Sequence, residues 1–171
     1  MNSVREAKAL GQGGLAWAGF ISVVKDGAKY DVKDKIELQI GLETKIGNNW
    51  YEFSTAGNIL FGFYGQAAGF TEFELRAGAG AAQLADYDRD PTSGIGDWST
   101  FYDTENDYAA VGFGIYLYDN YYKDDGELTE ADLLAAFESY SNANKMALIE
   151  KPKDFKPRYY EYPVNRFYQM E

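Results

Sequence analysis

Apolar side chains recur along most of this chain with the period of an α-helix. The pattern predicts helices over residues 4–24, 57–69, 71–86 and 103–122, and a further one from Thr129 to about residue 144. The prevalence of this period predicts a mainly α fold. A length of 171 residues suits a single domain, residues 1–171, with a sizeable core.

Two of these helices have a recognisable start. Thr71 is followed three residues later by Glu74, and Thr129 is followed in the same way by Asp132. In such a pairing the Thr side chain accepts a hydrogen bond from the third helical N–H, while the acid reaches back to the N–H of the Thr. We therefore expect helices that begin directly after Thr71 and Thr129.

Residues 36–53 follow the strand period instead. Every second residue from Ile36 to Leu42 is apolar, and Gly47-Asn48-Asn49 supplies a turn before the next apolar run. The pattern predicts a small β-hairpin, which makes the fold α+β with helices in the majority.

Three stretches show neither period. Residues 28–35 are polar, residues 87–102 combine Asp, Pro, Gly and Ser, and residues 150–171 are rich in Pro and Tyr. We expect a polar connection, a loop and an extended tail in these places. A loop as long as 87–102 is uncommon in a compact domain, and such loops often carry function.

The balance of charge argues against nucleic acid as a partner. The chain has 27 acidic and 16 basic residues, which gives a net charge of −11. A polyanion is bound mainly through Lys and Arg contacts to phosphate, and no run of five basic residues occurs here.

No apolar run approaches the roughly 20 residues of a membrane span. We therefore expect neither a nucleic acid nor a membrane as partner.

The chain contains neither His nor Cys. That excludes the commonest general base, thiol nucleophiles, disulfides and the usual structural zinc sites. Acid–base chemistry at neutral pH then falls to carboxylates, Tyr or Lys. Glycoside hydrolysis needs only two carboxylates in a cleft and no cofactor. The 15 Tyr, 11 Phe and 3 Trp can stack on sugar faces, or they can simply fill a core.

Acidic residues also gather around Gly126, between Asp119 and Asp132. Tyr121 and Lys123 would occupy the first and third ligand positions of an EF-hand, so the register excludes that motif. We expect a solvated turn there and no metal site.

One stretch carries a family resemblance. Residues 57–70 read GNILFGFYGQAAGF, a Gly-Asn pair followed by aromatics, glycines and an Ala-Gly step. This is similar to the central motif of the bacterial polymorphic toxin type 44 domain. Three further segments fall in that family's order: VKDGAKYDVK (24–33), ELRAGAGAAQ (74–83) and YDTENDYAAVGFGIYLY (102–118). The resemblance covers roughly residues 17–122, which leaves a C-terminal helix and tail at 123–171.

The resemblance implies an antibacterial effector or secreted cell-wall enzyme, lysozyme-like in character, that hydrolyses the glycan strand of peptidoglycan as a muramidase. Peptidoglycan or another polysaccharide would be its partner, and an immunity protein a second one. The resemblance also implies export, with the signal or delivery module not present in this chain. Two other functions fit the sequence: a nuclease toxin that uses the same carboxylates with Mg²⁺, and a non-catalytic module that binds wall polymers.

The chain departs from the family pattern near Asn58. Relatives commonly carry Asp just before the Gly-Asn pair and His or Asn two residues after it, where this chain has Ser54, Thr55 and Leu60. Either the family mechanism does not use that His, or this member is altered.

Asp107 and Asp103 are the first candidates for a catalytic pair. They are four residues apart, so on a helix they would share one face with Cβ atoms roughly 5–6 Å apart. Each also has a structural interpretation, Asp103 as an N-cap and Asp107 as a first-turn acid favoured by the helix dipole. Because a helix N-terminus favours a charged carboxylate, this position suits a nucleophile or base better than an acid.

The acid would then come from elsewhere in the chain. Glu52 lies between Tyr51 and Phe53, where burial would favour its protonated form, although a hairpin can equally turn it to solvent. Glu43 is a second candidate on the same ground. Asp31, in the segment KYDVK, matches a Trp-Asp-aromatic-Lys segment of many relatives, and it could instead cap the next element.

Five residues are expected to bind substrate. Asn58 and Gln83 are amides beside small residues, where they could hydrogen-bond an N-acetyl group or hydroxyl, or else satisfy backbone groups. Gly57 and Gly62 leave the side of Asn58 open, which makes it the stronger of the two. The remaining three are aromatic: Tyr64, Trp50 and Tyr102.

Overall fold

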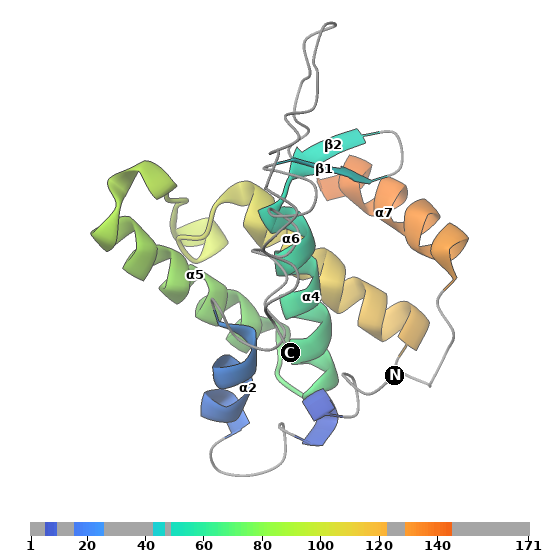
Figure 1. Ribbon diagram of the computed structural model, residues 1–171, viewed down its shortest axis with the longest axis horizontal. Coiled ribbons are helices and arrows are strands. Elements are labelled where there is room, and N and C mark those ends of the chain that lie inside the picture. Colours follow the sequence, from blue (N-terminus) through green and yellow to red (C-terminus); the bar gives the residue numbers. More distant parts are fainter. Residues whose placement is uncertain (1–5, 10–15, 26–42, 47–48, 123–128, 145–171) are drawn as a thin grey trace, which may run out of the picture.

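The computed structural model describes residues 6–9, 16–25, 43–46, 49–122 and 129–144, and most of these residues are helical (Figure 1). In chain order the elements are α2 (Ala16–Val24), β1 (Glu43–Ile46), β2 (Asn49–Glu52), α4 (Ser54–Ala67), α5 (Glu72–Arg89), η1 (Pro91–Ser93), η2 (Trp98–Thr100), α6 (Glu105–Leu117), η3 (Tyr118–Tyr122) and α7 (Glu130–Asn144). Residues 6–9 add one helical turn. The prediction of a mainly α fold is confirmed.

Helices α4 and α6 form the centre of the molecule. They make the most extensive contact between any two elements in the described part of the chain. A Cβ on Gly114 would collide with the carbonyl oxygen of Ile59, and one on Gly62 would collide with that of Val111. Glycine at both places therefore lets the two backbones approach closely. Figure 1 shows α5 and α7 on opposite sides of this central pair, with the hairpin near one end and α2 near the other.

The sequence of α6 explains its central position. The helix is apolar nearly all the way round, which is typical of a helix buried on several sides. Val111 and Ile115 belong to a core cluster shared with α2, α4 and α5. Phe113 and Leu117 belong to a second cluster, which includes Tyr51 of β2 and residues of α7. Helix α6 therefore lies between the two core clusters and contributes side chains to both.

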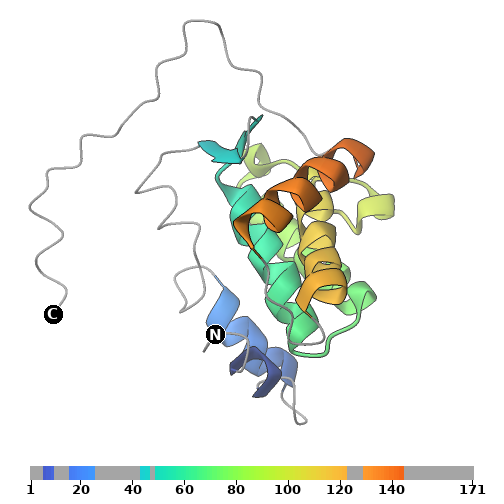
Figure 2. The same cartoon turned by 90° about the vertical axis from the view of Figure 1, so that its right-hand side faces the viewer.

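Helix α2 packs across α4 and α5 through aromatic side chains. The ring of Trp17 lies against Gly78 of α5 and makes an edge contact with Phe70, with ring centroids 4.8 Å apart. Phe20 is buried and contacts Phe61 of α4 at 5.5 Å. Figure 2 shows α2 beside the end of α4 that lies away from the hairpin. Its C-terminal turn is therefore held at a fixed place next to the two longer helices.

The segment between α5 and α6 is ordered by short-range hydrogen bonds. Asp97 accepts from the Ser99 N–H, and the Tyr102 N–H donates to the Asp97 carbonyl at 2.8 Å. Phe101 and Tyr102 both adopt positive φ angles, 58° and 71°, which are rare for bulky residues. Such backbone strain persists only where the surroundings hold it, and it is common beside functional sites.

Several element boundaries differ from the predicted ones. Helix α4 runs from Ser54 to Ala67 and not from residue 57 to 69. The loop begins at Asp90 and not at residue 87, because α5 continues to Arg89. Helix α6 begins at Glu105, so residue 103 lies outside it. The hairpin pairs Glu43–Ile46 with Asn49–Glu52 in antiparallel register.

The predicted N-caps at Thr71 and Thr129 are confirmed. The Thr71 hydroxyl accepts from the Glu74 N–H, and the Thr129 hydroxyl accepts from the Asp132 N–H at 3.2 Å. Several other predictions concern residues outside the described part: the first half of the 36–53 strand region, the connection at 28–35, the acidic turn around residue 126 and the tail at 150–171.

Candidate functional site

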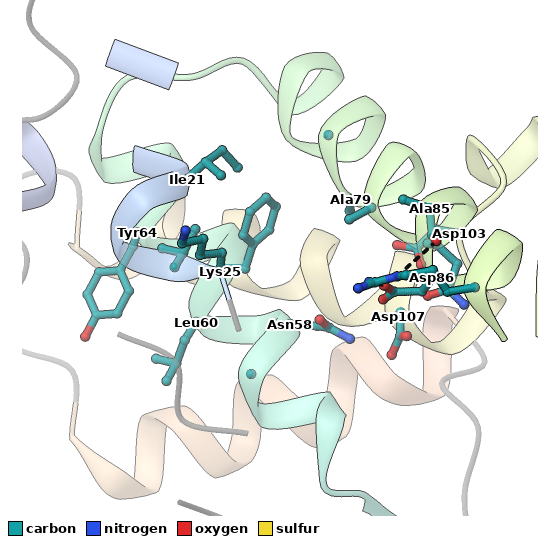
Figure 3. A pocket seen from close by; sticks show the side chains of 17 residues that line it. Ile21, Lys25, Asn58, Leu60, Tyr64, Ala79, Ala85, Asp86, Asp103 and Asp107 are labelled. Atoms are coloured by element: carbon teal, nitrogen blue, oxygen red, sulfur yellow. Dashed lines mark hydrogen bonds and ion pairs between the residues drawn. The ribbon is translucent and has the colours of Figure 1, made fainter. Parts of the chain in front are cut away.

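A pocket of about 320 Å³ lies between α2, α4, α5 and the start of α6 (Figure 3). The loop before α6 and the first turn of that helix contribute two carboxylates, and α4 and α5 contribute amides and small residues. Figure 3 shows Asp86, Asp103 and Asp107 toward one end, Ile21, Lys25, Leu60 and Tyr64 toward the other, and Asn58 between them. The pocket therefore has an acidic end and an apolar end.

Asp103 is held in place by its own loop. Its side chain is 4% exposed, and a carboxylate oxygen accepts from the Thr104 N–H at 2.9 Å. Its carbonyl oxygen accepts from the Thr100 hydroxyl at 2.6 Å. A Cβ on Gly96 would collide with that same carbonyl. The strained turn at Phe101 and Tyr102 precedes it directly, so the whole loop serves to fix the position of this carboxylate.

Asp107 sits in the first turn of α6. The N-cap of that helix is Thr104, whose hydroxyl accepts from the Asp107 N–H at 3.2 Å. Neither structural prediction for Asp103 is therefore correct: it is not the N-cap, and it does not share a helical face with Asp107. The physical reason is that Thr104 supplies the capping hydroxyl one residue later. The two carboxylates reach the same pocket from different segments, one from the loop and one from the helix.

A side-chain contact ties the start of α6 to α4. The Asn106 amide donates to the hydroxyl of the buried Thr55 at 3.2 Å. Thr55 lies one turn before Asn58 on α4, so this contact fixes the acidic end of the pocket relative to Asn58. Sequence reasoning treated Thr55 only as a departure from the family pattern.

The two amides in the pocket differ in how they are used. Gln83 donates from its side chain to the carbonyl oxygens of Ser93 at 3.2 Å and Gly94 at 2.8 Å, so it braces the loop that precedes Asp103. The side-chain nitrogen of Asn58 is buried and makes no hydrogen bond within the described part of the chain. Of the two, Asn58 is the amide with a donor left for a ligand.

Three charged pocket residues were not predicted from the sequence: Lys25, Asp86 and Arg89. Arg89 forms an ion pair with Asp86 one turn earlier on α5, and both side chains are exposed. Their spacing from Gln83 along one helical face was available as a signal. No local pattern distinguishes Lys25, because it reaches the pocket only through the packing of α2 on α4 and α5.

Five of the ten predicted site residues line the pocket: Asp103, Asp107, Asn58, Gln83 and Tyr64. Four do not. Glu43 and Glu52 lie directly opposite each other on the hairpin, where Glu52 is exposed and Glu43 is half-buried. Trp50 is also on the hairpin, and Tyr102 is 45% exposed on the loop before α6. Asp31 lies outside the described residues. The hairpin thus places its carboxylates away from the pocket.

No group of three or more acidic side chains in the described segments is arranged to hold a metal ion. None of the described helices combines the length and the apolar character needed to cross a membrane.

A family comparison places this pocket in context. The family model described as Bacterial toxin 44 matches residues 19–120, more than half of the chain. The chain belongs to the Bacterial toxin 44 family. No curated protein and no solved structure matches it.

Membership in the Bacterial toxin 44 family indicates a toxin effector. Every residue that lines the pocket, from Ile21 to Asp107, falls inside the matched segment. Helix α7 lies beyond it. The part of the chain that defines this Bacterial toxin 44 domain is therefore sufficient to supply the whole pocket lining.

Proposed function

We propose that this toxin domain is a glycoside hydrolase that cuts the glycan strand of peptidoglycan, with Asp103 and Asp107 as its carboxylate pair. The observation that carries the proposal is their convergence: a loop residue and a helix residue present two carboxylates to one pocket in a chain without His or Cys. Hydrolysis of a glycosidic bond needs two such groups and no cofactor.

The surroundings of each carboxylate suggest its role. Asp107 lies in the first turn of α6, where the helix dipole stabilises negative charge, which suits the nucleophile or base. Asp103 is the second carboxylate of the pocket, held by the loop on the other side of Thr104, so we assign it the proton transfer to the leaving oxygen. Asp103 gives its proton to the glycosidic oxygen as the bond from that oxygen to the anomeric carbon breaks. A water molecule then gives its hydroxyl to the anomeric carbon, directly or after a glycosyl ester has formed on Asp107, and gives its other proton to the carboxylate that activates it.

The rest of the pocket suits a sugar better than a nucleic acid. Asn58 offers an amide donor to a sugar N-acetyl carbonyl or hydroxyl, and apolar side chains lie on the other side of it. The pocket lining contains two cationic and three Asp side chains, and the whole chain carries a net charge of −11. Such a field repels a polyphosphate backbone. An extracytoplasmic polymer as substrate also entails export of the domain, which we include in the proposal.

The direct test is product analysis on purified peptidoglycan. We expect the 171-residue chain to release fragments with new reducing ends between pH 4 and pH 8, and Asp103→Asn and Asp107→Asn to abolish the release. Asp88→Asn is a matched control, because Asp88 is exposed on α5 and does not line the pocket. It should retain the wild-type rate.

Parallel digestions separate the alternatives. Absence of new reducing ends at every pH, with intact wild-type protein, would overturn the hydrolase. Degradation of tRNA that stops on addition of EDTA would assign the carboxylates to a metal-dependent nuclease instead. Binding to peptidoglycan without any turnover would leave a wall-binding module.

A further inference from the structure

The end of the pocket opposite the carboxylates has a composition of its own. Lys25 lies there beside Ile21 and Leu60, and the apolar side chains of Val24 and Phe61 also line the pocket. These residues come from the last turns of α2 and the middle of α4. The arrangement is a single cation set against an apolar wall.

The two cations of the pocket are not equivalent. Arg89 is engaged by Asp86 at the acidic end. The Lys25 side chain is exposed, and no described carboxylate lies within ion-pair distance of its ammonium group. Its ammonium group is therefore the pocket cation with bonding capacity left for an incoming anion.

The position of Lys25 is fixed by packing. Its N–H donates to the Ile21 carbonyl at 3.0 Å, which continues the helical pattern of α2 by one residue. Phe20 is buried on the same helix and anchors it to Phe61. A lysine whose backbone is held beside a pocket loses less freedom on binding an anion than one on a loose segment.

The pocket is long enough to separate this cation from the reacting carboxylates. Gly78 and Arg89 both line the pocket and are eleven residues apart on α5, so the pocket extends for roughly 16 Å along that helix. Figure 3 shows Lys25 toward the end of the pocket opposite Asp103 and Asp107. A ligand that reaches both Lys25 and Asp107 must therefore be elongated.

We infer that the α2 end of the pocket is a subsite for the carboxylate carried by the muramic acid side arm of a glycan strand, with Lys25 as the group that binds it. This inference rests on the proposed function and deepens it. The lactyl arm of muramic acid carries a carboxyl group and a methyl group. Where a stem peptide is attached, this carboxyl becomes an amide and the carboxylates are those of the peptide. A cation beside an apolar wall complements that chemistry. The uncharged sugars of chitin have no carboxylate that could pair with the cation.

A structural reason for a lysine at this place also exists. A cation in the last turn of a helix interacts favourably with the helix dipole, without any ligand. That role affects stability and leaves ligand preference unchanged. The two explanations therefore separate in a binding experiment.

The experiment is calorimetric titration of the full chain carrying Asp107→Asn, so that no substrate is consumed. Three glycans are compared: chitotetraose, the alternating tetrasaccharide of N-acetylglucosamine and N-acetylmuramic acid, and the same tetrasaccharide with stem peptides. We expect the tetrasaccharide of N-acetylglucosamine and N-acetylmuramic acid without stem peptides, whose lactyl carboxylate is free, to bind better than chitotetraose. Adding Lys25→Gln should weaken that binding roughly three- to fivefold, the range of an exposed ion pair, and leave chitotetraose unchanged.

Two further variants and one condition sharpen the result. Lys25→Arg should retain the preference, because it keeps the charge. Lys8→Gln removes the same charge from residues 6–9, which do not line the pocket, and should change nothing. The preference should shrink at 0.5 M salt, since screening weakens exposed charge pairs.

Equal weakening of all three glycans by Lys25→Gln, or no weakening of any, would overturn the subsite. So would a Lys25-dependent preference for a short RNA over the glycans. If the preference holds but the wild type releases no reducing ends, the subsite stands and the hydrolase proposal falls. If hydrolysis occurs and Lys25→Gln cuts both muramic acid glycans at the wild-type rate, the hydrolase stands and the subsite falls.

Discussion

The start of α6 and the β-hairpin each carry two of the carboxylates considered for catalysis, and the structure places the two pairs very differently. Asp103 and Asp107 reach a pocket from a braced loop and a helix N-terminus. Glu43 and Glu52 face each other across a two-stranded ribbon, with Glu52 exposed. The comparison shows that the useful carboxylates are those whose backbone is held by neighbouring elements, because such support is what keeps a reacting group in position.

The largest expected effect comes from a substitution that forces α6 away from α4, the contact that supports the pocket carboxylates. Gly114→Val places a branched side chain against the Ile59 carbonyl, and overpacking of this kind should lower the free energy of unfolding by about 2–3 kcal/mol. The matched control is Ala81→Val on the exposed side of α5, which should cost well under 1 kcal/mol. Urea denaturation measures both. Equal losses would show that the α4–α6 contact does not hold the site.

A smaller change tests the helix start directly. Thr104→Ala removes the hydroxyl that accepts from the Asp107 N–H, and loss of an N-cap costs about 1 kcal/mol. Because the cap also positions Asp107, hydrolysis should fall by more than the loss of folded protein explains. Thr104→Ser keeps the hydroxyl and should restore both stability and rate. A variant that unfolds more easily but cuts at the full rate would contradict a positioning role for Thr104.

The loop before Asp103 should make stability depend on pH in one direction. Hydrogen bonds from the Ser99 hydroxyl and backbone N–H hold the pKa of Asp97 below its ordinary value of 3.8. A lowered pKa in the folded state stabilises the fold above 3.8, and this contribution disappears as the pH falls through the lowered value. We therefore expect Asp97→Asn to be less stable than wild type at pH 7, and the difference to shrink toward pH 3. A difference that stays constant over this range would contradict the account.

The smallest effect belongs to the hairpin. Like charges directly opposite each other in a β-ribbon are destabilising, so Glu52→Lys should raise the free energy of unfolding by about 0.5 kcal/mol. The catalytic rate should not change, because the hairpin carboxylates do not line the pocket. Denaturation and hydrolysis measured on the same preparation check both statements. A large loss of rate in Glu52→Lys would show that a hairpin carboxylate takes part in catalysis.

Most of the fold could be predicted from local patterns. The pairings of Thr71 with Glu74 and of Thr129 with Asp132 mark helix starts because their hydrogen bonds are formed within four residues. The start of α6 was predicted wrongly because Asp103 and Thr104 are both good capping residues, and in the structure the Thr104 hydroxyl makes the cap. Local sequence does not determine which of the two adjacent residues becomes the N-cap.

The site was predictable only in part, for a related reason. Asp103, Asp107 and Asn58 lie in segments that carried a family pattern, and they meet in the pocket. Lys25 had no such signal, since α2 approaches α4 and α5 through contacts such as Trp17 on Gly78 that are distant in sequence. Glu52 was ambiguous because alternation along a strand does not reveal which face is covered.

The most direct test of the central claim compares one carboxylate from each region in the same assay. Reducing ends released from purified peptidoglycan are measured for wild type, Asp107→Asn and Glu52→Gln, after confirming that all three are folded. The account predicts that Asp107→Asn loses at least about 100-fold in rate, as expected for a general acid–base or nucleophilic group, while Glu52→Gln stays within about twofold of wild type. A wild-type rate in Asp107→Asn, or a loss confined to Glu52→Gln, would contradict it.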